Sequence, residues 1–311
     1  MASIFFAALG VVFTMLLYAV PGYVLIKTRL VKENAISSFA KLLMFIASPC
    51  LLFNSITKNE FSPELLIRLL ISFAFLSITF LSGLLIFYFI FRKKSEDVKF
   101  RIYNLATTLP NCAFMGVPVL EALFPNYPEA IAFSAMASLA LNLIGWSVGS
   151  YIISRDKRYI KAKKIFINPA MAALALAIPF FFLNSDLPFV VGNAVTLLAK
   201  MTTPLCMLIM GMRLAVVPLK DVFLNKANYL IVLIKQILFP LVIFFVLLPL
   251  PFDSGMKSSI FVMISCPVAS VVLTFSEMIG KGQKNAAGLV LLGTSLAIIT
   301  IPIMSPLISF F

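Results

Sequence analysis

Residues 109–118 read Leu109-Pro110-Asn111-Cys112-Ala113-Phe114-Met115-Gly116-Val117-Pro118, in the middle of an apolar run of the chain. A proline inside a helix removes one backbone hydrogen bond and clashes with the carbonyl group one turn earlier. Backbone groups freed in this way cannot face lipid, because lipid offers them no hydrogen-bond partner. The segment therefore predicts a broken helix whose middle faces protein or a watery cavity.

The rest of the chain has the composition of a membrane protein. Of its 311 residues, 61% are hydrophobic and 12% are charged, whereas soluble domains carry about 25% charged residues. A transmembrane helix needs about 20 apolar residues, so the chain has room for about ten spans. We predict an all-α integral membrane protein with spans near residues 4–26, 36–56, 65–91, 102–123, 129–153, 168–184, 189–212, 228–249, 257–279 and 286–309. We expect the first span to be retained, because it lacks the basic n-region and cleavage site of a signal peptide.

Basic residues are distributed unevenly among the predicted loops. The odd-numbered loops contain 18 Lys and Arg residues, whereas the even-numbered loops and their edges contain only Lys58, Arg68 and Lys257. Because basic loops stay in the cytoplasm, we expect the odd-numbered loops inside and both termini outside. The net charge of +13 then reflects topology and not nucleic-acid binding. We predict a multi-pass protein of the plasma or inner membrane.

The most basic loop, residues 154–166, lies at the middle of the chain. We interpret it as a cytoplasmic linker between two five-span repeats, residues 1–153 and 167–311. An odd number of spans gives the two halves opposite orientations, which is the topology of inverted-repeat transporters.

Prolines in the two halves agree with such a repeat. Pro49 interrupts predicted span 2 and Pro110 interrupts span 4, 61 residues later. Pro204 interrupts span 7 and Pro267 interrupts span 9, 63 residues later. We therefore predict that the broken spans 4 and 9 occupy matching positions and cross each other.

A crossing of two broken helices is suited to binding an anion. The N-termini of the half-helices carry partial positive charge and unpaired N–H groups, and the carbonyl groups at the facing C-termini can hold a cation. The alternative is a pair of kinked helices that only pack against each other. The candidate substrate-binding residues are Pro110, Asn111, Cys112, Ala113, Ser265, Pro267, Val268 and Ser270.

The segment 109–118 resembles the proline–asparagine crossover of the auxin efflux carrier family, and residues 266–277 resemble the ninth span of its bacterial members. The resemblance covers essentially the whole chain and implies a fold similar to that of bile acid:sodium symporters. It implies a scaffold of spans 1, 2, 6 and 7, a moving transport domain of spans 3–5 and 8–10, an elevator-type mechanism and a homodimer. The long central loop of the plant hormone carriers is missing, so a dicarboxylate such as malonate or malate is as suitable a substrate as an auxin-like acid.

Ionisable residues inside predicted spans are costly in lipid and are functional candidates. Glu277, Lys200, Lys41 and Glu121 are candidates for coupling or ion-pair roles, and snorkelling to the headgroups is the alternative for Lys41. Two further basic residues near span ends, Arg213 and Lys235, are expected to snorkel to the cytoplasmic headgroups.

Other functions fit the composition poorly. The chain contains no histidine, its four cysteines lie in apolar stretches without a CxxC pair, and no phosphate-binding GxxxxGK[ST] loop occurs. We therefore expect neither an enzyme nor a bound metal or cofactor. The best-supported function is secondary transport of a small organic anion, with coupling to H⁺ or Na⁺ left open. A cation/proton antiporter of related fold is the alternative, although every Asp lies in a predicted loop.

Overall fold

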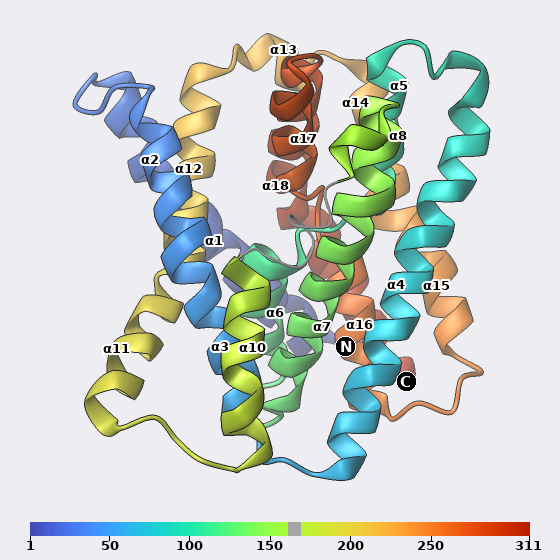
Figure 1. The fold of residues 1–311 in the computed structure, drawn as a ribbon. Helices are drawn as coiled ribbons and strands as arrows, with labels where there is room; N and C mark the ends of the chain where they lie inside the picture. Colours follow the sequence, from blue (N-terminus) through green and yellow to red (C-terminus); the bar gives the residue numbers. More distant parts are fainter. Residues whose placement is uncertain (161–168) are drawn as a thin grey trace.

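The computed structural model describes residues 1–160 and 169–311, and most of the described chain is helical (Figure 1). These residues contain no β-strand apart from one isolated bridge. Helices long and apolar enough to cross a membrane cover Ala2–Lys27, Ala35–Thr57, Pro63–Lys94, Glu129–Ser154, Phe189–Val216, Lys226–Leu247 and Gln283–Phe310. The predicted all-α class is thereby confirmed, and seven of the predicted spans correspond to helices with the length and composition of membrane spans.

Several of these spans consist of consecutive segments, some joined by π-helical or 3₁₀ turns (η). Before the linker the segments are α1 (Ala2–Lys27), α2 (Ala35–Leu42), η1 (Leu43–Ala47), α3 (Ser48–Thr57), α4 (Pro63–Phe91), η2 (Arg92–Lys94), α5 (Val98–Thr108), η3 (Cys112–Gly116), α6 (Val117–Leu123), α7 (Glu129–Ile144), η4 (Gly145–Gly149), α8 (Ser150–Ser154) and η5 (Lys157–Tyr159). After it they are α10 (Pro169–Phe182), α11 (Phe189–Lys200), α12 (Thr202–Val216), α13 (Leu219–Phe223), α14 (Lys226–Leu233), η6 (Ile234–Leu238), α15 (Phe239–Leu247), α16 (Ser254–Ser265), α17 (Val271–Ile279), α18 (Gln283–Met304) and η7 (Ser305–Phe310).

The other three predicted spans are not single long helices. The predicted span 102–123 is divided into α5 and the η3–α6 segment, and the predicted span 257–279 is divided into α16 and α17. Both divisions contain a proline, which removes one helical hydrogen bond and favours a break. The predicted span 168–184 corresponds to α10, a shorter apolar helix.

Close packing of α1 against α12 depends on two glycines. A Cβ added at Gly22 would clash with the backbone of Leu208, and a Cβ added at Gly211 would clash with the backbone of Ala19. Small residues let membrane helices approach each other in this way. In Figure 1, α2, α11 and α12 lie on the left of the molecule, and α4, α5 and α15 lie on the right.

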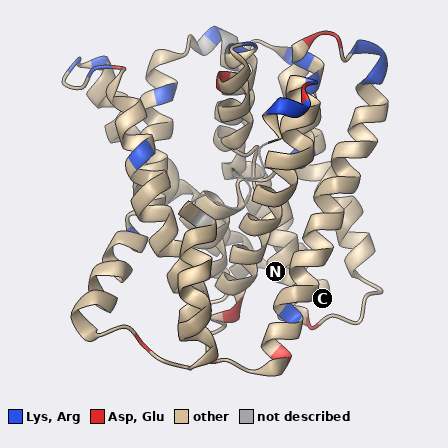
Figure 2. Ribbon diagram, in the orientation of Figure 1, with Lys and Arg blue, Asp and Glu red and all other residues tan. Residues whose placement is uncertain are grey.

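Lys and Arg residues gather at one end of the molecule, the upper end in Figure 2. The marked N- and C-termini lie in the lower half of the same view. The basic loops and the termini are therefore found towards opposite ends of the helices. Three basic residues of the predicted linker, Lys161, Lys163 and Lys164, lie outside the described residues.

Candidate functional site at the crossing of two broken helices

The two broken helices are bonded to each other at their breaks. The N–H group of Asn111 donates to the carbonyl oxygen of Pro267 over 2.8 Å, and the N–H group of Ala269 donates to the carbonyl oxygen of Leu109 over 3.0 Å. Buried backbone groups need hydrogen-bond partners. Each break therefore satisfies groups that the proline of the other break has freed.

Prolines set where the helices end. Leu109 has a ψ of 116° and Cys266 a ψ of 150°, and this extended conformation is the one that a following proline favours. Pro110 and Val268 face each other in the resulting antiparallel bridge. The predicted breaks at Pro110 and Pro267 are confirmed, and the prediction that the two broken helices cross is confirmed with them.

Close approach of the two broken helices depends on Gly116 in η3. A Cβ added there would lie 2.7 Å from Sδ of Met263 and 3.2 Å from Sγ of Cys266. Both neighbours belong to the end of α16 or to the break that follows it. A larger residue at position 116 would have to displace the side chain of Met263 or push the second broken helix away.

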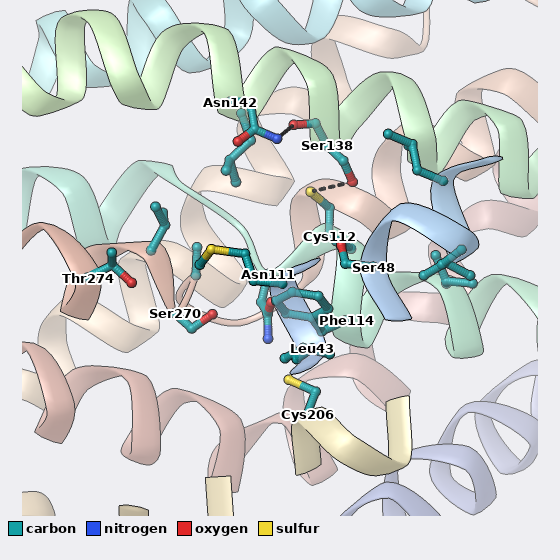
Figure 3. A pocket seen from close by; sticks show the side chains of 18 of the residues that line it. Leu43, Ser48, Asn111, Cys112, Phe114, Ser138, Asn142, Cys206, Ser270 and Thr274 are labelled. Atoms are coloured by element: carbon teal, nitrogen blue, oxygen red, sulfur yellow. Dashed lines mark hydrogen bonds between the residues drawn. The ribbon is translucent and has the colours of Figure 1, made fainter. Parts of the chain in front are cut away.

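A cavity of about 470 Å³ lies beside the crossing (Figure 3). Small-molecule sites have volumes of about 300–1,000 Å³, so the cavity has room for a small ligand. Apolar side chains form most of its lining, and Arg213 is the one charged residue among the described residues that line it. Its uncharged polar side chains belong to Ser48, Ser55, Asn111, Ser134, Ser138, Asn142, Ser270 and Thr274.

Asn111 lines this cavity and carries an unpaired hydrogen-bond donor. The residue immediately precedes η3 and is 4% exposed, yet its Nδ2 atom has no hydrogen-bond partner among the described residues. In Figure 3 this nitrogen points towards Cys206 of α12, across the cavity. Leaving a buried donor unpaired costs about 1–3 kcal/mol. A ligand that accepts from Asn111 would recover this free energy.

Asn142 lines the same cavity but its amide is already engaged. Its Nδ2 atom donates to the carbonyl oxygen of Ser138 over 2.9 Å, and Oγ of Ser138 lies 3.8 Å from Sγ of Cys112. The contact between Ser138 and Cys112 joins α7 to η3, as Figure 3 shows. The two cavity asparagines therefore differ in the availability of their donors.

The structure separates the candidate substrate-binding residues into two groups. Ser265, Pro267 and Val268 are not among the lining residues: the hydroxyl group of Ser265 donates within α16 to Phe261, and the other two lie in the backbone pairing. The candidates that do line the cavity are Pro110, Asn111, Cys112, Ala113 and Ser270.

Sequence reasoning did not select several lining residues. Ser134, Ser138 and Asn142 follow one another at intervals of four, which places them on one face of a helix. This spacing could have predicted a polar face on a helix inside the membrane. Thr274, one turn after Ser270, could have been found in the same way.

The two basic residues expected to snorkel have different surroundings in the structure. Arg213 of α12 forms an ion pair with Glu277 of α17, with 3.1 Å between Nη1 and Oε1. Lys235 is entirely buried, and its Nζ atom donates to the carbonyl oxygen of Ile264 over 2.7 Å. The snorkelling prediction is wrong for Lys235, because the turn that carries this residue packs against the end of α16.

A second cavity of about 290 Å³ contains two more of the predicted ionisable residues. Glu121, Lys200 and Lys58 all line it, but no ion pair joins them within the described chain. The two cavities share three lining residues, which form the partition between them: Leu51, Ser55 and Val117. Lys41 is exposed and lines neither of these cavities.

Comparison with known proteins identifies the protein family of this chain. A curated relative, an uncharacterized transporter from Methanocaldococcus jannaschii, is 27% identical over 221 residues, which is 68% of this chain and 70% of that protein. The model of a family described as membrane transport protein matches residues 6–164 and 156–305. These matches cover almost the whole chain and confirm the resemblance found at residues 109–118. The chain therefore belongs to the membrane transport protein family, whose members are related to the auxin efflux carriers.

Proposed function

We propose that the protein is a secondary transporter that binds a small organic carboxylate at the crossing of its two broken helices. The observation that carries the proposal is the buried, unpaired Nδ2 atom of Asn111 in a largely apolar cavity. A carboxylate oxygen is an acceptor that matches this donor, and the apolar lining suits the body of an organic acid.

Electrostatics favour an anion at this place. The segments that begin at Cys112 and Val271 start beside the cavity, so the N-terminal ends of both lie next to it. A helix N-terminus carries about half a positive charge. None of the described lining residues is acidic, so nothing in the lining repels a carboxylate. The same absence of Asp and Glu argues against the cation/proton antiporter, which needs a carboxylate at the crossing.

The arrangement of the two cavities supports an elevator mechanism. Each cavity is lined on one side by α3 and α12 and on the other by α6, η3 or α7. We assign α1–α3 and α10–α12 to the scaffold, and α4–α8 with α14–α18 to the transport domain of an inverted repeat of ten spans. Movement of the transport domain past Leu51 and Ser55 would carry the crossing from one cavity to the other.

Orientation follows from the basic end of the molecule. We place the end with the Lys- and Arg-rich loops in the cytoplasm and both termini outside. A single cysteine introduced by Lys157→Cys should then resist an impermeant thiol reagent in intact cells, whereas a C-terminal tag should be accessible. Efficient labelling of this cysteine from outside would show that the proposed topology is the wrong way round.

Arg213 suggests a second candidate substrate. Arg213 is one of the lining residues of the same cavity, so a dicarboxylate could place one carboxylate at Asn111 and the other at Arg213. Arg213→Gln should weaken binding of dicarboxylates and leave aromatic or aliphatic monocarboxylates unchanged.

Direct binding of a ligand panel to the purified protein tests the proposal. The panel contains aromatic and aliphatic monocarboxylates, dicarboxylates including malonate and malate, and the neutral amide of each acid. We expect at least one acid to bind and its amide to bind at least about tenfold more weakly, because the helix N-termini act on charge. Equal binding of acids and amides would contradict an anion site. Proteoliposomes with imposed proton or sodium gradients would then report transport of the acid that binds.

A further inference from the structure

Lys235 is the most deeply buried charged side chain near the crossing. It lies in η6, the π-helical turn between α14 and α15, and its exposed fraction is 0%. Its Nζ atom donates over 2.7 Å to the carbonyl oxygen of Ile264, the penultimate residue of α16. π-helical turns inside α-helices are frequently found at functional sites.

Because the helix is broken after α16, the carbonyl group of Ile264 lacks the backbone N–H donor that a continuous helix would supply. In a continuous helix the N–H group four residues later, that of Val268, would donate to it. Val268 instead lies in the backbone bridge with Pro110. The ammonium group of Lys235 therefore takes the position of the missing donor at the C-terminal end of the half-helix.

A helix C-terminus carries about half a negative charge and attracts cations. This one is buried inside the protein, where Lys235 is the cation that meets it. None of the ion pairs in the described residues includes Lys235, and the ring of Phe239 lies 5.6 Å from Nζ to the ring centroid. The end of α16 is thus the main electrostatic partner of the ammonium group.

The neighbouring residue, Gln236, anchors the turn that carries this ammonium group. Its Nε2 atom donates to the carbonyl oxygen of Gly293 over 2.7 Å, and its Oε1 atom accepts from Thr300 over 2.8 Å. A Cβ added at Gly293 would lie 3.5 Å from the backbone nitrogen of Val268, so α18 holds η6 against the break. Lys235 does not line the cavity beside Asn111, so it acts on the crossing through the end of α16.

We infer that Lys235 is a built-in cation that replaces a bound metal cation at the end of α16, so that the crossing forms and binds its substrate without sodium. The ammonium group compensates the carbonyl end of the broken helix. The part of this inference that concerns substrate rests on the proposed function, whereas the cation position itself does not.

Thermal unfolding of the purified protein tests the cation position without any substrate. The unfolding temperature of the wild type should be the same in sodium, potassium and choline chloride at equal ionic strength. In Lys235→Ala the vacated position should admit a small cation, and sodium or methylammonium should raise the unfolding temperature by about 2–4 °C relative to choline. Lys257→Ala is the matched control, because Lys257 also donates to a carbonyl group at a helix end, that of Leu248, over 3.0 Å. It should gain no cation dependence.

Binding of the best carboxylate completes the test. Lys235→Met keeps the length of the side chain without its charge, and we expect it to bind the acid at least about tenfold more weakly than the wild type. Wild-type protein that is stabilised by sodium, or Lys235→Met that binds as the wild type does, would overturn the inference. If no carboxylate binds to any variant but Lys235→Ala gains cation dependence, the built-in cation stands and the proposed substrate class fails.

Discussion

The break at residues 109–111 and the break at residues 266–270 each give the other one N–H group and one carbonyl group, yet their surroundings differ. The first places Asn111, with an unpaired amide, in the wall of the cavity. Next to the second break, the ammonium group of Lys235 donates to the carbonyl oxygen of Ile264. The second break contributes Ser270 to the cavity lining. We therefore propose that similar backbone geometry serves recognition at one break and mainly support at the other.

The largest expected effect comes from separating the two breaks. Gly116→Leu places a side chain where Met263 and Cys266 lie within 3.2 Å of a Cβ atom, and overpacking of this kind costs about 1–3 kcal/mol or more. We expect a lower unfolding temperature and loss of carboxylate binding. Gly10→Leu is the control, because nothing lies within 4 Å of a Cβ at that position. If Gly116→Leu unfolds and binds as the wild type does, the close approach is not required.

Serines at the second break sharpen the distinction between recognition and support. Ser270→Ala removes a hydroxyl group from the cavity wall and should weaken carboxylate binding by about 0.5–1.5 kcal/mol. Ser265→Ala removes a hydroxyl group that bonds only within its own helix, so affinity should not change. Isothermal titration of both variants makes the comparison, and a larger loss in Ser265→Ala would reverse the assignment.

The smallest expected effect concerns the ion pair between Arg213 and Glu277, which joins α12 to α17. Partly exposed ion pairs contribute about 0.2–1 kcal/mol, and salt screens them. A double-mutant cycle with Arg213→Gln and Glu277→Gln should give a coupling free energy of this size at low salt and less at 1 M salt. A coupling free energy that is independent of salt would mean that this pair is effectively buried in solution.

Proline chemistry made the crossing predictable from sequence. Pro110 and Pro267 act on their own helices, and the amide of Asn111 stands beside one of them, so local rules identified the breaks and their most informative side chain. Hydropathy identified the long helices in the same way, since each carries its own apolar run.

Contacts between distant segments were not predictable in this way. Lys235 lies in the first half of the predicted span 228–249, and nothing in the neighbouring sequence indicates that η6 packs against Ile264. Ser265 and Ser270 flank the same proline, but only the register of the bridge decides which of them reaches the cavity. To predict the lining residues of α7, one would have to know which face of that helix meets the crossing.

The difference between Asn111 and Asn142 tests the central claim most directly. Both amides line the cavity, but the Nδ2 atom of Asn111 is unpaired and that of Asn142 donates to Ser138. Carboxylate affinity measured by scintillation proximity on purified Asn111→Ala should fall by about 1–3 kcal/mol. Asn111→Asp should lower it further, because a negative charge would face the substrate, and Asn142→Ala should change it much less. Wild-type affinity in both folded Asn111 variants would contradict the account and leave the crossing as a packing feature.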